Sequence, residues 1–198
     1  MAEITAAMVK ELRDKTGSGM MDCKRALAEN EGDIEKALDY LRTKGLAKAQ
    51  KRAGRTTSEG VVFPYIHTGS KLGVLVEINC ESDFVAKTDD FLEFAKNIAM
   101  HIAAANPAGL NPEDIPEAVI AREREIYQSQ ALEQGKPEKI IDKIVDGQIQ
   151  KFYKDSCLMS QPYIREPKKS IAEITTEAIA KIGENIQIKR FTRFQIGE

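Results

Sequence analysis

Residues 72–80 have the sequence LGVLVEINC, and the residues ESDFV follow them directly. Four apolar side chains in this run occupy every second position: Leu72, Val74, Val76 and Ile78. Because successive side chains of a strand point to opposite faces of a sheet, this alternation is typical of a strand with one buried face. The run therefore predicts a β-strand that supports a hydrophobic core.

Two further segments have strand character. Residues 61–66 form a β-like run, and Thr68-Gly69-Ser70-Lys71 between it and the strand at 72–80 has turn composition, which predicts a hairpin. The last strand-like segment runs from Ile186 to Ile196. Strands separated by several helices argue against a doubly wound parallel sheet. The predicted fold class is α+β, with a three-stranded antiparallel sheet covered by helices.

Helical patterns fill the sequence between the second and third strands. Thr88 can cap a helix whose apolar residues lie on one side, and a long helix is predicted from about Pro116 to Gln134. Another follows Gly135-Lys136-Pro137, whereas Met159–Pro167 contains two prolines and is predicted to be irregular. A capping box at Ser170 begins the last helix.

The first 45 residues have the pattern of three short helices. Thr5 and Asp33 are suitable N-caps for the first and third, and Gly45 lies where a helix often ends. So small a bundle buries little surface, which suits an attached recognition module better than a catalytic body. We therefore expect a three-helix module at 1–45, a basic linker at 46–59 that begins as a helix, and an α+β core domain at 60–198.

Composition limits the class of protein. The chain has 29 basic and 31 acidic residues, so its net charge predicts neither nucleic-acid nor membrane binding. No apolar stretch is long enough to span a membrane, and the N-terminus lacks the pattern of a signal peptide. The three cysteines, Cys23, Cys80 and Cys157, are widely spaced, which argues against a disulfide framework. We expect a reduced, cytoplasmic protein.

One basic segment leaves a nucleic-acid interface open as an alternative. Lys48, Lys51, Arg52 and Arg55 lie in the predicted linker. Nucleic-acid surfaces usually interleave aromatic residues with such charges, and none is present between these residues. A solvated linker is the favoured interpretation.

Signals of catalysis are weak. The chain has only two histidines, His67 and His101, and no nucleophile elbow, zinc-binding helix motif or phosphate loop. His101 lies one position from an apolar stripe, which favours a structural or surface role over catalysis. Glu77, Glu81 and Asp83 are close in sequence, but no catalytic base or metal ligand joins them. We expect no catalytic residue, no cofactor and no metal site.

Two short segments are candidates for protein recognition. Ser82-Asp83-Phe84-Val85 forms a strand-to-helix corner, where Phe84 either packs on the sheet or protrudes as an anchor for a partner. The adjacent Met20 and Met21 point about 100° apart on a helix, so one is expected in the core and one at the surface. The residues alone leave both choices open.

Several motifs resemble the bacterial elongation factor Ts family. In the N-terminal part these are Val9–Arg13, Thr16–Lys24 and Gly32–Ile34. In the core they are Glu77–Cys80 with the corner that follows, Ala99–Ala104, Gln161-Pro162 and Lys181–Ile186. The family signature at the corner is Thr-Asp-Phe-Val, and this chain has Ser82 in place of the threonine, which keeps the hydroxyl group. The resemblance covers essentially the whole chain.

The resemblance implies a guanine-nucleotide exchange factor for elongation factor Tu, a binding protein and not an enzyme. It implies a ubiquitin-associated-like module at the N-terminus whose Lys10, Leu12, Met20 and Met21 dock on the GTPase. It also implies that Ser82-Asp83-Phe84-Val85 is the element that displaces the partner's Mg²⁺.

Family members with a longer chain have two core subdomains, and this chain holds one. The resemblance therefore implies a homodimer, in which a second subunit supplies what the second subdomain supplies elsewhere. A generic adaptor that uses its three-helix module to bind other proteins remains the alternative from a different functional class.

Overall fold

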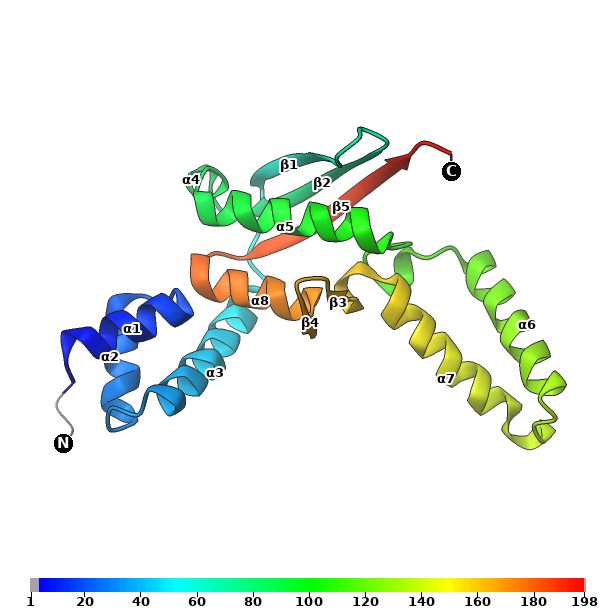
Figure 1. Cartoon of the computed structure of the whole chain (residues 1–198), viewed down its shortest axis with the longest axis horizontal. Coiled ribbons are helices and arrows are strands. Elements are labelled where there is room, and N and C mark those ends of the chain that lie inside the picture. The colour runs from blue at the N-terminus through cyan, green and yellow to red at the C-terminus, as the bar shows by residue number, and fades with distance from the viewer. Residues whose placement is uncertain (1–3, 198) are drawn as a thin grey trace. The chain divides into compact units, whose positions relative to one another are not determined.

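The computed structural model of the chain describes residues 4–197 (Figure 1). It is an α+β protein, as predicted from the sequence. Its α-helices are α1 (Ala6–Thr16), α2 (Met20–Glu29), α3 (Ile34–Arg52), α4 (Asp83–Ala86), α5 (Asp89–Ala105), α6 (Glu117–Glu133), α7 (Glu138–Ser156) and α8 (Ile171–Ile182). Its strands are β1 (Glu59–Ile66), β2 (Leu72–Cys80), β3 (Pro162–Tyr163), β4 (Glu166–Ser170) and β5 (Ile186–Gln195).

The predicted three-stranded sheet is present, with the antiparallel order β1-β2-β5. The alternation that predicted β2 is confirmed, because every second residue from Val74 to Cys80 is buried. Gly60 begins the pairing of β1 with β2: at φ 147° a Cβ there would lie 2.2 Å from the carbonyl oxygen of Ile78. Only glycine allows the two backbones to approach this closely.

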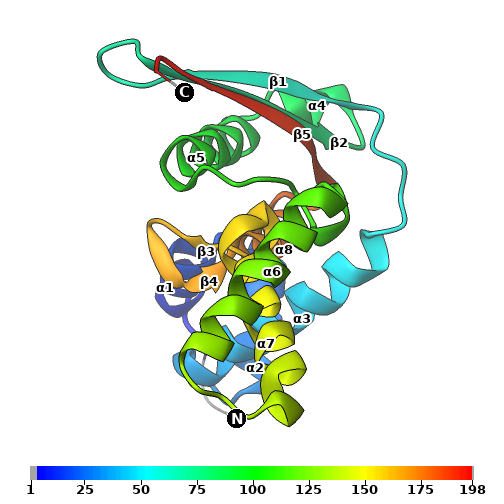
Figure 2. The same cartoon turned by 90° about the vertical axis from the view of Figure 1, so that its right-hand side faces the viewer.

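Helix α5 runs along one face of the sheet (Figure 2). Its predicted apolar side is confirmed, since the side chains of Phe91, Phe94, Ala95, Ile98, Ala99 and Ile102 are all buried. The Oγ1 atom of Thr88 accepts a hydrogen bond from the N–H of Phe91 at 3.4 Å, as expected of an N-cap. The chain after α5 turns back at Asn106, whose φ is 44°.

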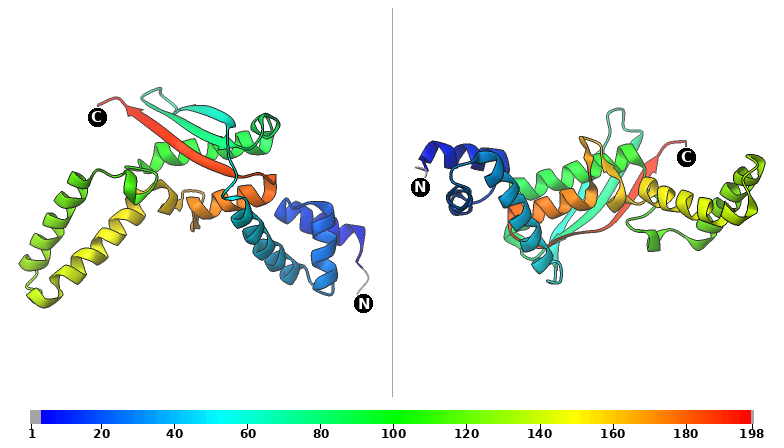
Figure 3. Two further views of the ribbon diagram at one scale, coloured as in Figure 1. Left: turned by 180° about the vertical axis from the view of Figure 1, so that it is seen from behind. Right: turned by 90° about the horizontal axis from the view of Figure 1, so that it is seen from below.

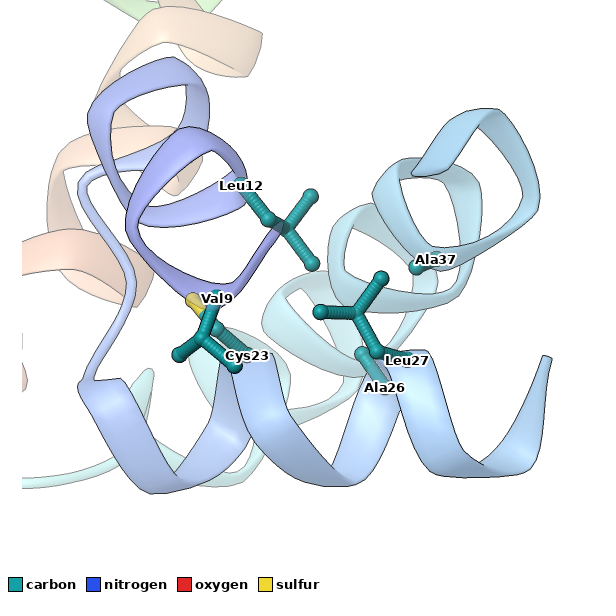
Figure 4. Close-up of a cluster of buried hydrophobic side chains, with 6 residues drawn as sticks. All are labelled: Val9, Leu12, Cys23, Ala26, Leu27 and Ala37. Carbon is teal, nitrogen blue, oxygen red and sulfur yellow. The ribbon is translucent and has the colours of Figure 1, made fainter. Parts of the chain in front are cut away.

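Helices α1, α2 and α3 pack around a small core of their own. The buried side chains are Val9, Leu12, Cys23, Ala26, Leu27 and Ala37 (Figure 4). The predicted caps are confirmed: Thr5 accepts a hydrogen bond from the N–H of Met8 at 3.3 Å, and Asp33 accepts one from Lys36 at 3.0 Å. Because three of the six side chains are alanine or cysteine, this core depends on the larger ones, Leu12 and Leu27.

The predicted end of the third helix at Gly45 is wrong, because α3 continues to Arg52. A Cβ at Gly45 would lie 3.0 Å from the Cβ of Ala180 in α8. The glycine therefore provides a close approach between two helices instead of a helix end. The predicted linker does begin as a helix, as expected, and the boundaries of the module, linker and core remain a prediction.

Helices α6 and α7 form a helical hairpin (Figure 3). The predicted bounds of α6 are confirmed to within one residue. The two helices share the buried residues Ala131, Ile141, Val145 and Ile149. An ion pair joins Arg124 in α6 to Asp146 in α7 at 2.8 Å, but both side chains are exposed and contribute little stability.

The segment predicted to be irregular contains short regular elements. A 3-10 turn at Leu158–Ser160 is followed by β3 and β4, which pair as an antiparallel two-stranded sheet. The prolines do not prevent this pairing, because Pro162 lies at the first position of β3, where a missing N–H group is tolerated.

The fold divides into two compact units. The first comprises the residues up to Phe63 together with Val76–Lys96 and Glu173–Lys189, and the second comprises Pro64–Leu75, Asn97–Ala172 and the residues from Arg190 onward. The corner at residues 81–85 and the helices α1, α2 and α3 belong to the first unit. Within residues 4–197, no helix is both long enough and apolar enough to cross a membrane.

Candidate functional site

The candidate site is the corner at residues 81–85, between the end of β2 and the single turn of α4. Ser82 has an extended backbone and caps this turn: its Oγ atom accepts a hydrogen bond from the N–H of Val85 at 3.4 Å. An extended residue followed directly by helical residues makes the chain change direction sharply. The sequence SDFV therefore forms the predicted strand-to-helix corner.

Phe84 protrudes from this corner. Its exposed fraction is 80%, the largest among the exposed large apolar side chains of residues 4–197. Ala86, two residues later, faces inward and is buried. Of the two alternatives that the residues left open, the structure has the exposed one, and the action of Phe84 on a partner remains a prediction.

Glu184, which follows α8, binds the corner through its carboxylate. Its Oε2 atom accepts hydrogen bonds from the backbone N–H groups of Glu81 and Ser82, each at 3.0 Å. Its Oε1 atom accepts a third bond from the hydroxyl of Ser82 at 2.6 Å. Hydrogen bonds to a charged carboxylate are short and about twice as strong as neutral ones.

A second set of bonds runs in the opposite direction. The Oε1 atom of Glu81 accepts a hydrogen bond from the backbone N–H of Asn185 at 2.7 Å, and Arg55 approaches the Oε2 atom at 3.2 Å. The N–H of Asn185 lowers the pKa of the Glu81 carboxyl, and Arg55 lowers it further. The buried Asn185 side chain donates to the carbonyl oxygen of Arg55 at 2.8 Å. The corner, the end of α8 and the segment after α3 are thus joined.

Two other residues near the corner, Asp83 and Cys80, differ in environment. Asp83 forms an exposed ion pair with Lys87 at 2.8 Å, and the hydrogen bond from Lys87 lowers the pKa of the Asp83 carboxyl. Cys80 is fully buried, and burial raises the pKa of its thiol to about 11. The thiol is therefore protonated and donates to the carbonyl oxygen of Ser82 at 3.1 Å.

Met20 and Met21 are both exposed, with exposed fractions of 52% and 69%. The prediction that one of them lies in the core is therefore wrong. Helix α1 approaches α2 one turn further along, where Thr16 Oγ1 lies 3.9 Å from Cys23 Sγ. The first turn of α2, after the uncapped Gly19, has no buried position for a methionine.

The two remaining predicted docking residues have opposite placements. Lys10 is exposed on α1. Leu12 has an exposed fraction of 0% and lies in the core of the three helices, so its prediction as a direct docking residue is corrected (Figure 4). Leu12 follows the helical spacing of the apolar stripe that holds α1 in place.

His101 has the structural role favoured by its sequence position. Its Nδ1 atom accepts a hydrogen bond from the N–H of Ile164 at 3.4 Å, so Nε2 carries the proton and donates to Gln161 Oε1 at 3.0 Å. Burial lowers the pKa of the imidazole, which favours this neutral form. Among residues 4–197, no group of three or more His, Cys, Asp or Glu side chains could hold a metal ion.

Sequence reasoning identified the corner but missed the residues that hold it. Glu184 and Asn185 lie 102 and 104 residues away from the groups they bind, and Arg55 lies in the predicted linker. Their local sequence carries no signal for these contacts.

Comparisons with known proteins match the whole chain. Residues 3–198 match the model of a protein family described as Elongation factor TS. A protein named Elongation factor Ts from Desulfosudis oleivorans is 63% identical over 198 residues, which is 100% of both chains. Proteins of the same name from Syntrophomonas wolfei and Solidesulfovibrio magneticus are 62% and 60% identical, over 98% and 100% of this chain and 91% and 99% of theirs.

Proposed function

Because this chain belongs to the elongation factor Ts family, it acts in translation elongation, and we propose that it drives GDP release from elongation factor Tu through Phe84. An exchange factor of this kind is not an enzyme in the usual sense, since it forms and breaks no covalent bond. The single observation that carries the proposal is the 80% exposure of Phe84 on a corner held by Glu184. An exposed aromatic side chain on a fixed support is well suited to act as an anchor in a protein interface.

In the proposed mechanism, Phe84 inserts between helices of the GTPase, and Asp83 lies beside it. The insertion displaces the groups of the partner that hold Mg²⁺ against the nucleotide phosphates. Since Mg²⁺ neutralises phosphate charge, its loss weakens nucleotide binding. A buried aromatic anchor contributes about 2 kcal/mol or more, which is enough for at least tenfold weaker binding. Coupling is reciprocal, so an incoming nucleotide expels the factor in turn.

The helices α1, α2 and α3 form the proposed docking module, a ubiquitin-associated-like unit at residues 1–45. Lys10, Met20 and Met21 are exposed and form its contact surface. A flexible, polarisable methionine side chain adapts to a partner surface at low cost. Leu12 supports this surface from inside, by holding α1 against its neighbours.

A homodimer forms part of the proposal. Exposed apolar side chains lie on the strands of the second unit and on the residue after β5: Ile66, Leu75, Phe194 and Ile196. Exposed apolar side chains of this size suit burial against a second copy. Cys157 is fully buried, so it is not placed to crosslink two subunits. Sedimentation of the free protein tests this part, and a monomer at micromolar concentration would contradict it.

Release of labelled GDP from elongation factor Tu tests the central proposal. The wild-type protein is expected to accelerate release, and the Phe84→Ala variant to lower the limiting rate at least about thirtyfold, because about 2 kcal/mol of anchor energy is lost. Leu132→Ala removes an exposed apolar side chain at the end of α6 and serves as the matched control, with an unchanged rate. A Phe84→Ala variant with full activity would exclude the wedge.

The GDP-release assay and a measurement of RNA binding separate the alternatives. A generic adaptor would leave GDP release unchanged even with the wild-type chain. A nucleic-acid binder would show salt-sensitive binding to RNA through residues 48–55. In the structure, Lys48 pairs with Asp22 at 3.0 Å and Arg55 with Glu81 at 3.2 Å, so two of these cations already have carboxylate partners. The exchange proposal places the protein in the cytoplasm and assigns it no RNA ligand.

A further inference from the structure

Phe84 lies on a very short support. Helix α4 has only four residues, Asp83–Ala86, and a helix of one turn is not stable by itself. Apolar packing holds only its inner side, where Ala86 is buried. The direction of Phe84 therefore depends on what fixes the backbone immediately before it.

We infer that Glu184 is the positioning residue of the exchange reaction, and this inference rests on the proposed function of Phe84. The Glu184 carboxylate accepts three hydrogen bonds from two consecutive residues: the N–H groups of Glu81 and Ser82, each at 3.0 Å, and the Ser82 hydroxyl at 2.6 Å. Three hydrogen bonds donated to one planar carboxylate fix both the position and the rotation of this peptide. Phe84 follows two residues later.

The Ser82 hydroxyl transmits this constraint into α4. Its hydrogen points to Glu184, and its oxygen accepts from the N–H of Val85 at 3.4 Å. A single hydroxyl thus connects the carboxylate to the turn that carries Phe84. The threonine of the family signature has a hydroxyl group at the same position, so the hydrogen bonds to Glu184 and from Val85 are compatible with either residue.

The position of Glu184 is itself fixed. Its neighbour Asn185 is buried, donates its backbone N–H to Glu81 at 2.7 Å, and donates its side chain to the carbonyl oxygen of Arg55 at 2.8 Å. Glu81 and Ser82 therefore bind to Asn185 and Glu184 in a reciprocal pair of contacts. Every partner lies in the same compact unit as the corner.

Two substitutions of Glu184 separate geometry from charge. Glu184→Ala removes all three hydrogen bonds, and the limiting rate of GDP release is expected to fall about tenfold. Glu184→Gln keeps the length of the side chain: its oxygen can accept from both N–H groups, and its amide can donate to Ser82. This conservative variant is expected to recover the rate to within about threefold of wild type. The exposed Glu93→Gln in α5 is the matched control and is expected to leave the rate unchanged.

A double-mutant cycle tests whether Glu184 acts through Phe84. In a Phe84→Ala background, Glu184→Ala is expected to lower the limiting rate less than about twofold further, because the group that it positions is already gone. A full tenfold loss in both backgrounds would assign Glu184 a general structural role and overturn the inference. The concentration of factor at half-maximal rate is expected to change little in Glu184→Ala, since docking through Met20 and Met21 is retained.

Fluorescence anisotropy gives a readout that does not depend on exchange. The chain contains no tryptophan, so a Phe84→Trp substitution reports the corner without background. Adding Glu184→Ala is expected to increase the fast local motion of the indole, whereas Glu93→Gln is not. An indole that remains equally rigid overturns the inference.

The two proposals fail in different ways. If Phe84→Ala lowers the rate but Glu184→Ala does not, the positioning role is wrong and the wedge stands. If Phe84→Ala has no effect, the wedge is wrong, and the anisotropy alone decides whether Glu184 holds the corner.

Discussion

The corner at residues 81–85 and the first turn of α2 both present apolar side chains, but they are supported differently. Phe84 follows a peptide whose N–H groups donate hydrogen bonds to the carboxylate of Glu184, more than a hundred residues away. Met20 and Met21 begin a helix whose N-cap, Gly19, makes no side-chain hydrogen bond. The corner is held mainly by buried and half-buried polar contacts over long range, whereas α2 is held mainly by the apolar core that it shares with α1 and α3.

From this difference we expect the two surfaces to have different functions. Hydrogen bonds fix direction, which a side chain needs if it is to enter one place in a partner. A methionine side chain can adapt its conformation to a partner, which suits a surface that contributes binding affinity without a fixed geometry. We therefore expect changes at the corner to alter the limiting rate of exchange, and changes at the methionine surface to alter the concentration at which exchange is half-maximal.

The largest expected effect comes from the support of the methionine surface. Leu12→Ala leaves a cavity in the small core of α1, α2 and α3 and is expected to lower the free energy of unfolding by about 3 kcal/mol. Urea unfolding measures this loss. In the exchange assay the half-maximal concentration should rise while the limiting rate at saturation is retained.

Lys10→Ala is the control for Leu12→Ala. It changes an exposed residue of the same helix and is expected to alter the free energy of unfolding by less than about 0.5 kcal/mol. If Leu12→Ala lowered the limiting rate as much as Phe84→Ala does, the two surfaces would not be independent and the comparison would fail.

An intermediate effect is expected from the methionines themselves. The double variant Met20→Ala/Met21→Ala is expected to raise the half-maximal concentration about tenfold, or about 1.4 kcal/mol of docking energy, at an unchanged limiting rate. Met20→Leu/Met21→Leu keeps the apolar area and should lie close to wild type. A reduced limiting rate in the alanine variant would assign these residues to the nucleotide-exchange step itself.

The smallest effect is expected at Lys87. Its ion pair with Asp83 is exposed, so Lys87→Ala should change the limiting rate less than about twofold. Lys87 lowers the pKa of Asp83, so the pair contributes at neutral pH and is lost as the pH falls through that lowered value. Without Lys87, the NMR titration of Asp83 should move to higher pH. An unmoved titration would contradict the role assigned to this pair.

Much of the fold was predictable because its signals are local. Alternation identified β2, and helical spacing identified α5 and its buried side, since each pattern records which side chains face the core. Gly45 was predicted to end a helix because glycine ends many helices. Its position inside α3 instead allows a close approach to Ala180, which lies in a helix distant in sequence. Local sequence cannot report such a contact.

The candidate site was predictable in part for the same reason. The corner follows from a strand and a capping serine in succession, but the residues alone left open whether Phe84 is packed or exposed. Leu12 was assigned to the docking surface by resemblance, whereas the structure has it in the core. The role of Glu184 depends on tertiary structure alone and could not be read from residues 181–186.

The distance between Ser82 and Glu184 has a consequence for the order of events during synthesis. Phe84 leaves the ribosome early, but the carboxylate that binds Ser82 is added 102 residues after that serine. Segments of a nascent chain organise in the order in which they emerge. A chain stalled after α7 would carry Phe84 on an unsupported turn. Under the proposed mechanism, we therefore expect the corner to engage a GTPase only after the α8–β5 junction has been made.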